Sequence, residues 1–191
     1  MTISEALFAT RHLVLEPIQN RHFCNLLRLQ GDRRVMRHIP GGTRSREQVA
    51  SAIERYTMHW SKFGHGMWSV FCGKSVRFLG IAGLQRAEEF DGVHVAMLLF
   101  QEPREFDVAL EAFCAAAIFG FEHLDVQEVF ALTRSRNSAA LKLLERTPFR
   151  RAQQSRVVFG GVRQQLYHCD RFAFHEYLDS RPELYIRPAR C

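Results

Sequence analysis

Two polar residues in the middle of the chain are suited to chemistry, namely His94 and Asp107. A histidine has an ordinary pKa of about 6.5, so it can release or accept a proton near neutral pH. Asp107 stands directly before the apolar stretch 108–123, where aspartate is a favoured helix N-cap. The free amides at the amino terminus of a helix also favour an anion such as phosphate. His94 is therefore a candidate proton carrier. The start of the stretch 108–123 is a candidate anion site, and Asp107 itself would cap it.

The bulk composition is ordinary for a globular protein. The 191 residues, with 47% hydrophobic and 24% charged side chains, fit one domain, predicted over 1–178, with a tail over 179–191. The five cysteines form no CxxC pair, so no metal site or disulfide framework is predicted, and a reducing compartment is favoured. The longest apolar stretch, 113–121, is too short to cross a bilayer, and no secretory signal is visible. We therefore expect a cytoplasmic protein that does not span a membrane.

The formal net charge of +6 is compatible with nucleic-acid binding, with arginines spread over the surface, or with attraction of an anionic cofactor. No extended basic run and no RNP-like or zinc-finger spacing is present. We therefore do not expect a nucleic-acid partner.

Hydrophobic periodicity and turn residues divide the chain into alternating helices and strands. Strands are predicted over 8–17, 67–72, 78–84, 93–100, 126–133, 149–159 and 163–174. Helices are predicted over 17–29, 46–63, 108–123 and 138–146, and 181–191 is predicted to be loose. Ser45 to Gln48 has the spacing of a capping box, and the helix 108–123 is apolar on nearly all sides.

This order of elements predicts a mixed α/β fold. The strand, buried helix and strand in the middle of the chain imply a parallel pair joined by a right-handed crossover. The flanking hairpins imply antiparallel pairing elsewhere in the sheet. We therefore expect a three-layer α/β/α sandwich with a mixed, largely antiparallel sheet.

Several short segments occur in a characteristic order and spacing. They are Thr10 to Leu15, Val35 to Ile39, Gly64 to Val70, Phe78 to Leu84, Phe121-Glu122, and Asn137 with Leu141, Leu144, Glu145 and Phe149. Together they resemble the GNAT N-acetyltransferases of the RimJ/RimL branch over residues 8 to 175. The resemblance implies the GNAT fold and transfer of an acetyl group from acetyl-CoA to an amine of a protein N-terminus or a small molecule.

The resemblance also implies where the donor binds. The central strands 93–100 and 126–133 would splay apart, and the pantetheine arm would pair with backbone groups of Met97, Leu98 and Leu99. The pyrophosphate would lie at the amino terminus of helix 108–123, where main-chain amides and the helix dipole favour an anion. Asn137, in the late motif, is a further expected donor contact.

The phosphate loop departs from the family pattern. The family reads roughly Arg-Gly-x-Gly-x-Ala/Gly, and the aligned residues are Arg104, Glu105, Phe106, Asp107, Val108 and Ala109. Two carboxylates thus replace two glycines. The repulsion between each carboxylate and a charge of the pyrophosphate would cost about 1–4 kcal/mol at partly exposed separations of about 4–5 Å. Either the helix caps itself and closes the site, or the acids turn outward while Arg104, Arg134 and Arg136 offset the extra negative charge.

Acetyl transfer to an amine needs a base that removes the ammonium proton. His94 stands where the family often carries an acidic residue on the third strand, so His94 is the candidate catalytic residue. The alternative is a half-exposed histidine beside the turn at Asp91-Gly92.

Three functions remain open. The chain is an acyl-CoA-dependent N-acyltransferase, or a non-catalytic binding or regulatory protein that has kept the fold and lost the cofactor, or a GNAT fold adapted to another acyl carrier. A homodimer is compatible with each, since related folds often pair through sheet edges or tails.

Overall fold

The fold was analysed in a computed structural model, which describes residues 7–87, 92–101, 107–159, 161–184 and 186–188. The strands form one sheet of nine, in the order β7-β8-β6-β5-β4-β3-β2-β1-β9. Their bounds are β1 Phe8–Thr10, β2 Leu13–Pro17, β3 Met67–Cys72, β4 Phe78–Ala87, β5 Gly92–Leu99, β6 Glu128–Thr133, β7 Arg150–Phe159, β8 Val162–Asp170 and β9 Ile186–Pro188. The helices are α1 Phe23–Gly31, α2 Arg33–Met36, α3 Arg46–Phe63, α4 Val108–His123, α5 Ser138–Leu144 and α6 Arg171–Asp179.

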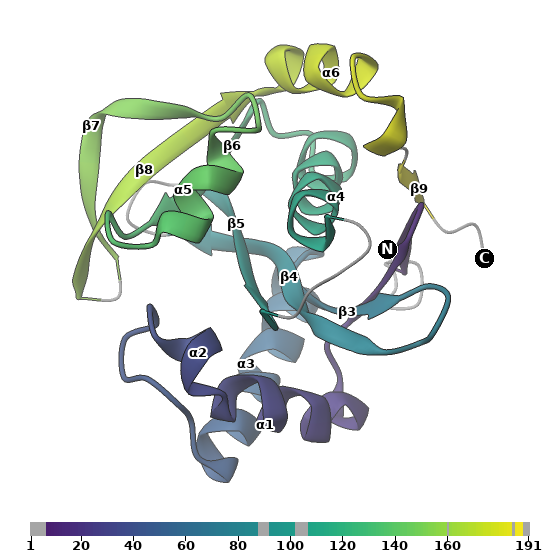
Figure 1. Ribbon diagram of the computed structural model, residues 1–191, viewed down its shortest axis with the longest axis vertical. Coiled ribbons are helices and arrows are strands. Elements are labelled where there is room, and N and C mark those ends of the chain that lie inside the picture. Colours follow the sequence, from purple (N-terminus) through teal and green to yellow (C-terminus); the bar gives the residue numbers. More distant parts are fainter. Residues whose placement is uncertain (1–6, 88–91, 102–106, 160, 185, 189–191) are drawn as a thin grey trace.

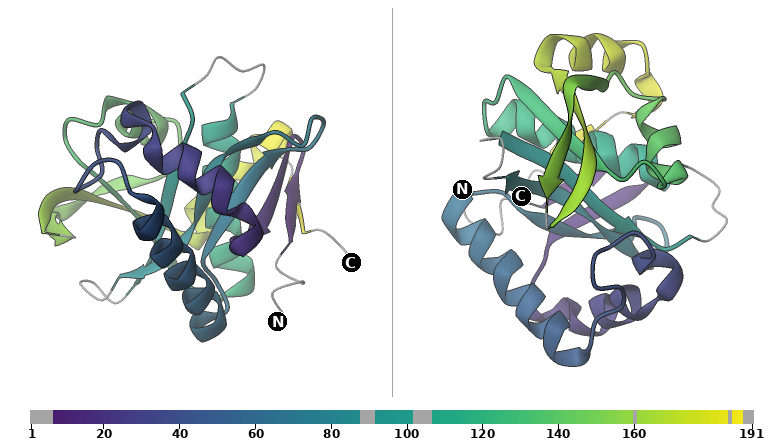
Figure 2. Two further views of the ribbon diagram at one scale, coloured as in Figure 1. Left: turned by 90° about the horizontal axis from the view of Figure 1, so that it is seen from below. Right: turned by 90° about the vertical axis from the view of Figure 1, so that its left-hand side faces the viewer.

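Helices cover both faces of the sheet, as Figure 1 shows. Helices α1, α2 and α3 lie on one face, and α4, α5 and α6 lie on the other. The second view of Figure 2 shows the same three layers from the side, with the sheet between the two groups of helices. The predicted three-layer sandwich is therefore confirmed, and its sheet is mixed and largely antiparallel.

The strands β5 and β6 form the only parallel pair among the described strands, and α4 connects them. Their ladder is short, because only His94 with Phe130 and Val95 with Ala131 are paired. Strand β5 nevertheless runs on to Leu99, where it is paired with β4 alone. The two central strands thus part in the middle of the sheet, as the family resemblance implied.

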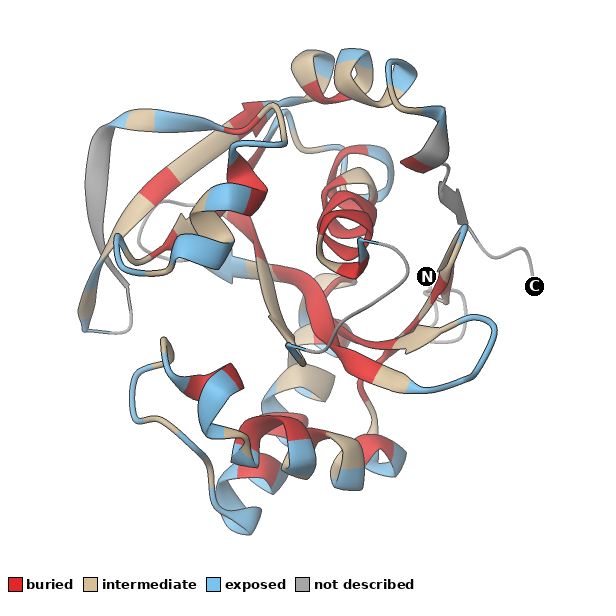
Figure 3. Ribbon diagram, in the orientation of Figure 1, coloured by how far each residue is buried: buried red, intermediate tan, exposed pale blue. Residues whose placement is uncertain are grey.

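Helix α4 is the most deeply buried helix, as its uniformly apolar sequence predicted (Figure 3). Its residues pack with the aromatic cluster Trp60, Trp68 and Phe119, whose ring centroids lie 4.9–6.1 Å apart. The Nε1 of Trp60 donates a hydrogen bond of 2.9 Å to the carbonyl of Met67, so this ring also joins α3 to β3. The core therefore fixes α4 firmly against the sheet.

Helix α3 has the termini that its sequence predicted. The Ser45 hydroxyl accepts from the Gln48 amide, and the Gln48 side chain accepts from the Ser45 amide, which completes the capping box. Gly64 ends the helix in the left-handed conformation at φ 69°. Within the described residues, no helix is both long enough and apolar enough to cross a membrane.

Glycine is required at Gly80, in the strand β4 that flanks β5. Its φ is +146°, and a Cβ there would lie 2.3 Å from the carbonyl oxygen of Leu98 and 2.7 Å from the Cα of Leu99. Such separations are far inside van der Waals contact, so β4 approaches the end of β5 as closely as it does only because Gly80 has no side chain.

Several predicted elements were wrong. The strand expected over 163–174 ends at Asp170, where helix α6 begins. The tail expected to be loose forms the short strand β9, which pairs with β1. The helix expected from 17 begins instead as a 3₁₀ turn at Asn20–His22, and the single strand expected over 8–17 is divided between β1 and β2.

Candidate functional site

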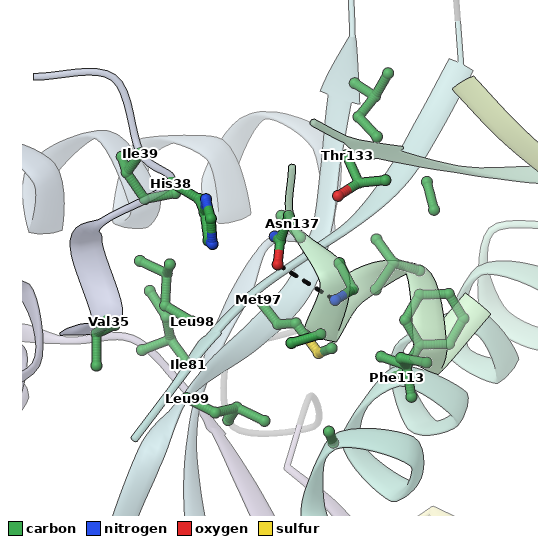
Figure 4. A pocket seen from close by; sticks show the side chains of 18 of the residues that line it. Val35, His38, Ile39, Ile81, Met97, Leu98, Leu99, Phe113, Thr133 and Asn137 are labelled. Carbon is green, nitrogen blue, oxygen red and sulfur yellow. Dashed lines mark hydrogen bonds between the residues drawn. The ribbon is translucent and has the colours of Figure 1, made fainter. Parts of the chain in front are cut away.

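A pocket of about 1060 Å³ lies where β5 and β6 part, and it has a wall on each side of the sheet. The first wall, here the α4–α5 wall, consists of Asp107, Val108, Ala109, Phe113, Asn137, Ala139, Ala140, Leu143 and Leu144. The second, here the α1–α3 wall, consists of Gln30, Val35, Met36, His38, Ile39, Pro40, Arg44 and Tyr56. Figure 4 shows Val35, His38 and Ile39 on one side of Met97, Leu98 and Leu99, and Asn137 and Phe113 on the other.

The end of β5 presents main-chain groups to this pocket. The amide of Phe100 donates to the carbonyl of Leu79 at 3.0 Å, so Phe100 turns its backbone groups toward the β4 side. Backbone groups alternate between the two edges of a strand, so Leu98 also faces β4, whereas Met97 and Leu99 face the side of β6. Because the ladder with β6 ends at Val95, these groups are directed into the gap and not to a neighbouring strand.

The amino terminus of α4 lies in the α4–α5 wall, and Asp107 caps it as predicted. The Asp107 Oδ1 accepts from the Leu110 amide at 3.0 Å, and its Oδ2 forms an ion pair with Arg146. The first amides of a helix, here those of Val108 and Ala109, have no acceptor within the helix itself. Asp107 therefore occupies one main-chain donor of the anion site, the Leu110 amide.

Asn137 is held rigidly at the start of α5. Its Oδ1 accepts from the Ala140 amide at 3.3 Å, and its own amide donates to the Arg134 carbonyl at 2.9 Å. The side chain thus caps α5, and the dashed line in Figure 4 marks this bond. Asn137 fixes the segment that carries Arg134 out of β6 and along the pocket.

His94 lies on β5 inside the pocket and is 3% exposed, so the alternative of a half-exposed histidine was wrong. Burial lowers the pKa of His94 to about 4, a hydrogen bond with the Gln85 backbone acts in the opposite direction, and His59 lowers the pKa further. At neutral pH the ring is therefore uncharged and able to accept a proton.

A second buried histidine lies nearby but outside the pocket lining. The Nδ1 of His65 donates to the Phe63 carbonyl at 3.0 Å, and burial lowers the pKa of His65 to about 4. The His65 carbonyl in turn accepts from Nδ1 of His59 at 2.8 Å, and His59 Nε2 accepts from the Arg86 amide at 3.2 Å. These histidines connect the end of α3 to β4, the strand that pairs with His94.

The structure brings the described members of the predicted site into this one pocket: His94, Met97, Leu98, Leu99, Asp107, Val108, Ala109 and Asn137. Arg104, Glu105 and Phe106 lie outside the described residues. The α1–α3 wall was missed, and it includes Tyr56, a half-buried residue of α3. The hydroxyl of Tyr56, which lies among apolar residues at helical intervals, was a signal for that role in the sequence.

The ionisable groups of the described chain do not resemble a metal centre. No group of three or more His, Cys, Asp or Glu side chains among the described residues is arranged to hold a metal ion. The buried thiol of Cys114, behind the α4–α5 wall, has its pKa raised to about 12 by burial. It therefore remains a thiol at neutral pH and packs as part of the core.

The fold is shared with solved acetyltransferase structures. An acetyltransferase from Agrobacterium tumefaciens superposes with a TM-score of 0.76 at 18% identity, covering 90% of this chain and 98% of that one. A GNAT-family acetyltransferase from Bacillus anthracis gives 0.68 at 15% identity, covering 85% and 95%. A protein from Vibrio cholerae, assigned as a ribosomal-protein-serine acetyltransferase, gives 0.73 at 16% identity, covering 89% and 99%.

Sequence comparison assigns the family independently of these superpositions. Residues 12–150 match the acetyltransferase (GNAT) domain family, which is more than half of the chain. That segment runs from the start of β2 to the first residue of β7 and includes both walls of the pocket. The chain therefore belongs to the GNAT acetyltransferase family and is an N-acetyltransferase.

Proposed function

We propose that the protein transfers an acetyl group from acetyl-CoA to a primary amine, either a protein N-terminus or a small molecule. The observation that carries this proposal is the pocket at the point where β5 and β6 part, with a wall on each face of the sheet. Such a pocket lets two substrates enter from opposite faces and meet beside β5. The α4–α5 wall would take the donor, and the α1–α3 wall would take the amine.

The residues of the α4–α5 wall and of the adjoining end of β5 fit acetyl-CoA. The Met97 and Leu99 backbone groups offer an unpaired strand edge to the amides of the pantetheine arm, and Leu98 lies between them in the lining. The amides of Val108 and Ala109 offer donors for a phosphate at the start of α4. When bound, acetyl-CoA supplies the activated thioester and the leaving thiolate.

Asp107 makes that fit less favourable without abolishing it. Its carboxylate is near the proposed phosphate position, but Arg146 pairs with it. This ion pair reduces the repulsion between the carboxylate and a phosphate. We propose that acetyl-CoA binds in spite of Asp107, and that Asn137 and Ala109 contact the donor from the two helix starts. Arg104, Glu105 and Phe106, which precede this cap, complete the proposed phosphate contacts.

The reaction of an ammonium group with acetyl-CoA gives the acetylated amine, the free thiol and one released proton. The nitrogen of the free amine forms a bond to the acetyl carbon, the carbon–sulfur bond breaks, and the thiolate takes a proton as the amide forms. A β5 amide that faces the gap stabilises the negative oxygen of the intermediate. The ammonium form of the amine must first lose its proton.

We propose that His94 is the catalytic residue that accepts this proton. The neutral ring lies in the lining on β5, the strand beside which the two substrates would meet. Its pKa of about 4 means that holding the proton costs roughly 3 kcal/mol more than in an ordinary histidine. His94 therefore passes the proton on rapidly to water and does not remain charged.

We also propose a family branch and a cellular location for the protein. The Vibrio cholerae neighbour is assigned to ribosomal-protein serine acetylation, which supports the RimJ/RimL branch for this chain. The cysteines at 24, 72, 114 and 169 are free, which supports a reducing, cytoplasmic location.

The test is amine-dependent release of coenzyme A. Purified protein is mixed with acetyl-CoA and a panel of peptides and small amines, thiol release is followed continuously, and the products are checked by mass for one added acetyl group. We expect release above the hydrolytic background with at least one amine. Absence of acetyl-CoA binding and of transfer to any amine would argue for the non-catalytic alternative, whereas transfer that is unchanged in His94→Gln would remove His94 from the proposal.

A further inference from the structure

Two arginines line the pocket without a carboxylate partner. Arg44 lies in the α1–α3 wall, and Arg134 follows β6 directly. Both side chains are half-buried, and neither forms an ion pair with any residue that the structure describes. The Nε of Arg134 is buried and has no hydrogen-bond partner among the described residues.

The backbone holds both arginines in place. The Arg44 amide donates to the Gln30 carbonyl at 3.0 Å, and the Arg134 carbonyl accepts from the Asn137 amide at 2.9 Å. The charge of Arg44 lowers the pKa of Tyr56 against the larger effect of burial, and the charge of Arg134 contributes to the lowered pKa of His38. Both charges therefore act on ionisable groups of the α1–α3 wall. The two guanidinium groups are therefore part of the pocket and not of the outer surface.

The described part of the pocket lining has no free acid to balance them. Among the described lining residues only Asp107 carries a carboxylate, and that group is already bound by Arg146 and by the Leu110 amide. The side of the pocket that faces α1–α3 thus has a net positive charge. A half-buried guanidinium without a partner is a strong site for a carboxylate or phosphate.

Gln30 adds a neutral polar group to the same wall. Its side chain is 1% exposed and interacts with the Tyr56 hydroxyl, yet its Oε1 has no hydrogen-bond partner among the described residues. A buried carbonyl oxygen without a donor is destabilising, because it has lost its hydrogen bonds to water. A ligand with an N–H or O–H group would restore a hydrogen bond there.

We propose that the acceptor is an amine that also carries an anionic group, a carboxylate or a phosphate, which Arg44 and Arg134 bind. This inference rests on the proposed transferase function and specifies its substrate class. The acceptor's N–H or O–H group donates to Gln30. A polyamine is disfavoured, because its second cation would lie beside two arginines.

A series of amines with the same two-carbon spacing tests the charge preference. O-phosphoethanolamine and β-alanine carry an anion, ethanolamine is neutral at that end, and ethylenediamine carries a second cation. Each amine is titrated by calorimetry into the protein without acetyl-CoA, and each is then assayed for thiol release at saturating acetyl-CoA. We expect both anionic amines to bind and react at least about tenfold better than ethanolamine, with ethylenediamine the poorest. The phosphate and carboxylate arms show which anion the site prefers.

Three variants locate the preference in the pocket. Arg44→Gln and Arg134→Gln should each reduce the ratio of anionic to neutral amine by about tenfold while leaving the dissociation constant of acetyl-CoA unchanged. Arg136→Gln is the matched control, because Arg136 is exposed, lies two residues from Arg134 and does not line the pocket. Folding of each variant is checked by its thermal transition.

The outcomes separate this inference from the proposed function. If neutral and anionic amines bind and react equally, or if ethylenediamine is preferred, the anionic acceptor is wrong while the transferase function stands. If Arg134→Gln weakens acetyl-CoA and leaves the amine preference intact, the arginine belongs to the donor site and the inference fails. If acetyl-CoA does not bind, the proposed function itself fails, and the calorimetric titration of the amines alone still decides the charge preference.

Discussion

The two walls of the pocket are built in different ways. The α4–α5 wall consists of regular elements, namely the two helices whose starts Asp107 and Asn137 cap, and it faces the end of β5. The α1–α3 wall consists of helix ends and the irregular connection between α2 and α3, in which Gly41 and Gly42 have positive φ angles of 82° and 68°. Regular elements fix geometry closely, whereas connections vary in sequence and carry specificity.

The walls also differ in charge. The acid of the α4–α5 wall is neutralised by Arg146, while the arginine of the α1–α3 wall has no ion-pair partner among the described residues. We interpret this difference as a division between a donor site set by the fold and an acceptor site set by this particular sequence. Four experiments test this difference between the two walls.

The largest effect is expected from Gly80→Ala, which acts on the donor side. The new Cβ would clash with Leu98 and Leu99, and the φ of +146° is strained for alanine. We expect a loss of about 3 kcal/mol or more in the free energy of unfolding, measured with urea. Gly41→Ala is the control, since its φ is +82° but its Cβ would meet nothing within 4 Å. Equal losses in both variants would show that β4 does not hold β5 by close approach.

The next effect concerns the reaction between the two walls. His94→Gln should lower kcat by about 100-fold with little change in the dissociation constant of acetyl-CoA, because a general base contributes on that scale. His65→Gln is a matched control, since His65 has a similarly lowered pKa but does not line the pocket. Similar kcat values in the two variants would remove His94 from the mechanism.

A smaller effect links the same histidines to stability. His65 and His94 have folded pKa values of about 4, below the ordinary 6.5, so between these values the unfolded chain binds more protons. Their contribution is complete above about pH 6.5 and is lost as the pH falls toward 4. Each should cost about 2 kcal/mol of unfolding free energy between pH 7 and pH 5. Urea unfolding at both pH values should show a smaller loss for His65→Gln, and an unchanged loss would refute the buried neutral form.

The elements that the sequence predicted well have local signals. Helix α4 was predicted with its observed bounds, because its residues are mostly apolar and follow a capping aspartate. Helix α3 was predicted from its capping box and terminal glycine. The parallel pair followed from chain order alone, since a strand, a buried helix and a strand leave few other arrangements.

The errors have physical causes in particular residues. Phe172 and Phe174 alternate as in a strand, but Phe172 is 79% exposed, and Phe174 packs with Tyr177 one helical turn later. Asp170 is the N-cap of α6, and this residue could have predicted the helix from the sequence. Strand β9 depends on β1, a partner that is distant in the sequence, so no local pattern predicts this strand.

The candidate site divides in the same way. The α4–α5 wall was predictable because its residues follow one another in chain order at strand and helix ends. The α1–α3 wall gathers Gln30, Arg44 and Tyr56 from three separate segments, and Arg134 joins them from beyond β6. Their convergence depends on tertiary packing, which periodicity does not encode.

The smallest expected effect concerns the cap of α4 and the donor itself. Asp107→Ala removes a carboxylate beside the proposed phosphate position and frees the Leu110 amide, so acetyl-CoA should bind about tenfold more tightly. The change also removes an N-cap worth about 1 kcal/mol. Asp170→Ala is the control, because Asp170 caps α6 through the Ala173 amide at 2.8 Å and does not line the pocket.

A donor site on the α4–α5 wall is tested by calorimetric titration of acetyl-CoA into the wild-type protein, Asp107→Ala and Asp170→Ala. We expect saturable binding at one site per chain in the wild type, tighter binding in Asp107→Ala and unchanged binding in Asp170→Ala. Absence of binding in all three folded proteins would contradict a donor site on the α4–α5 wall.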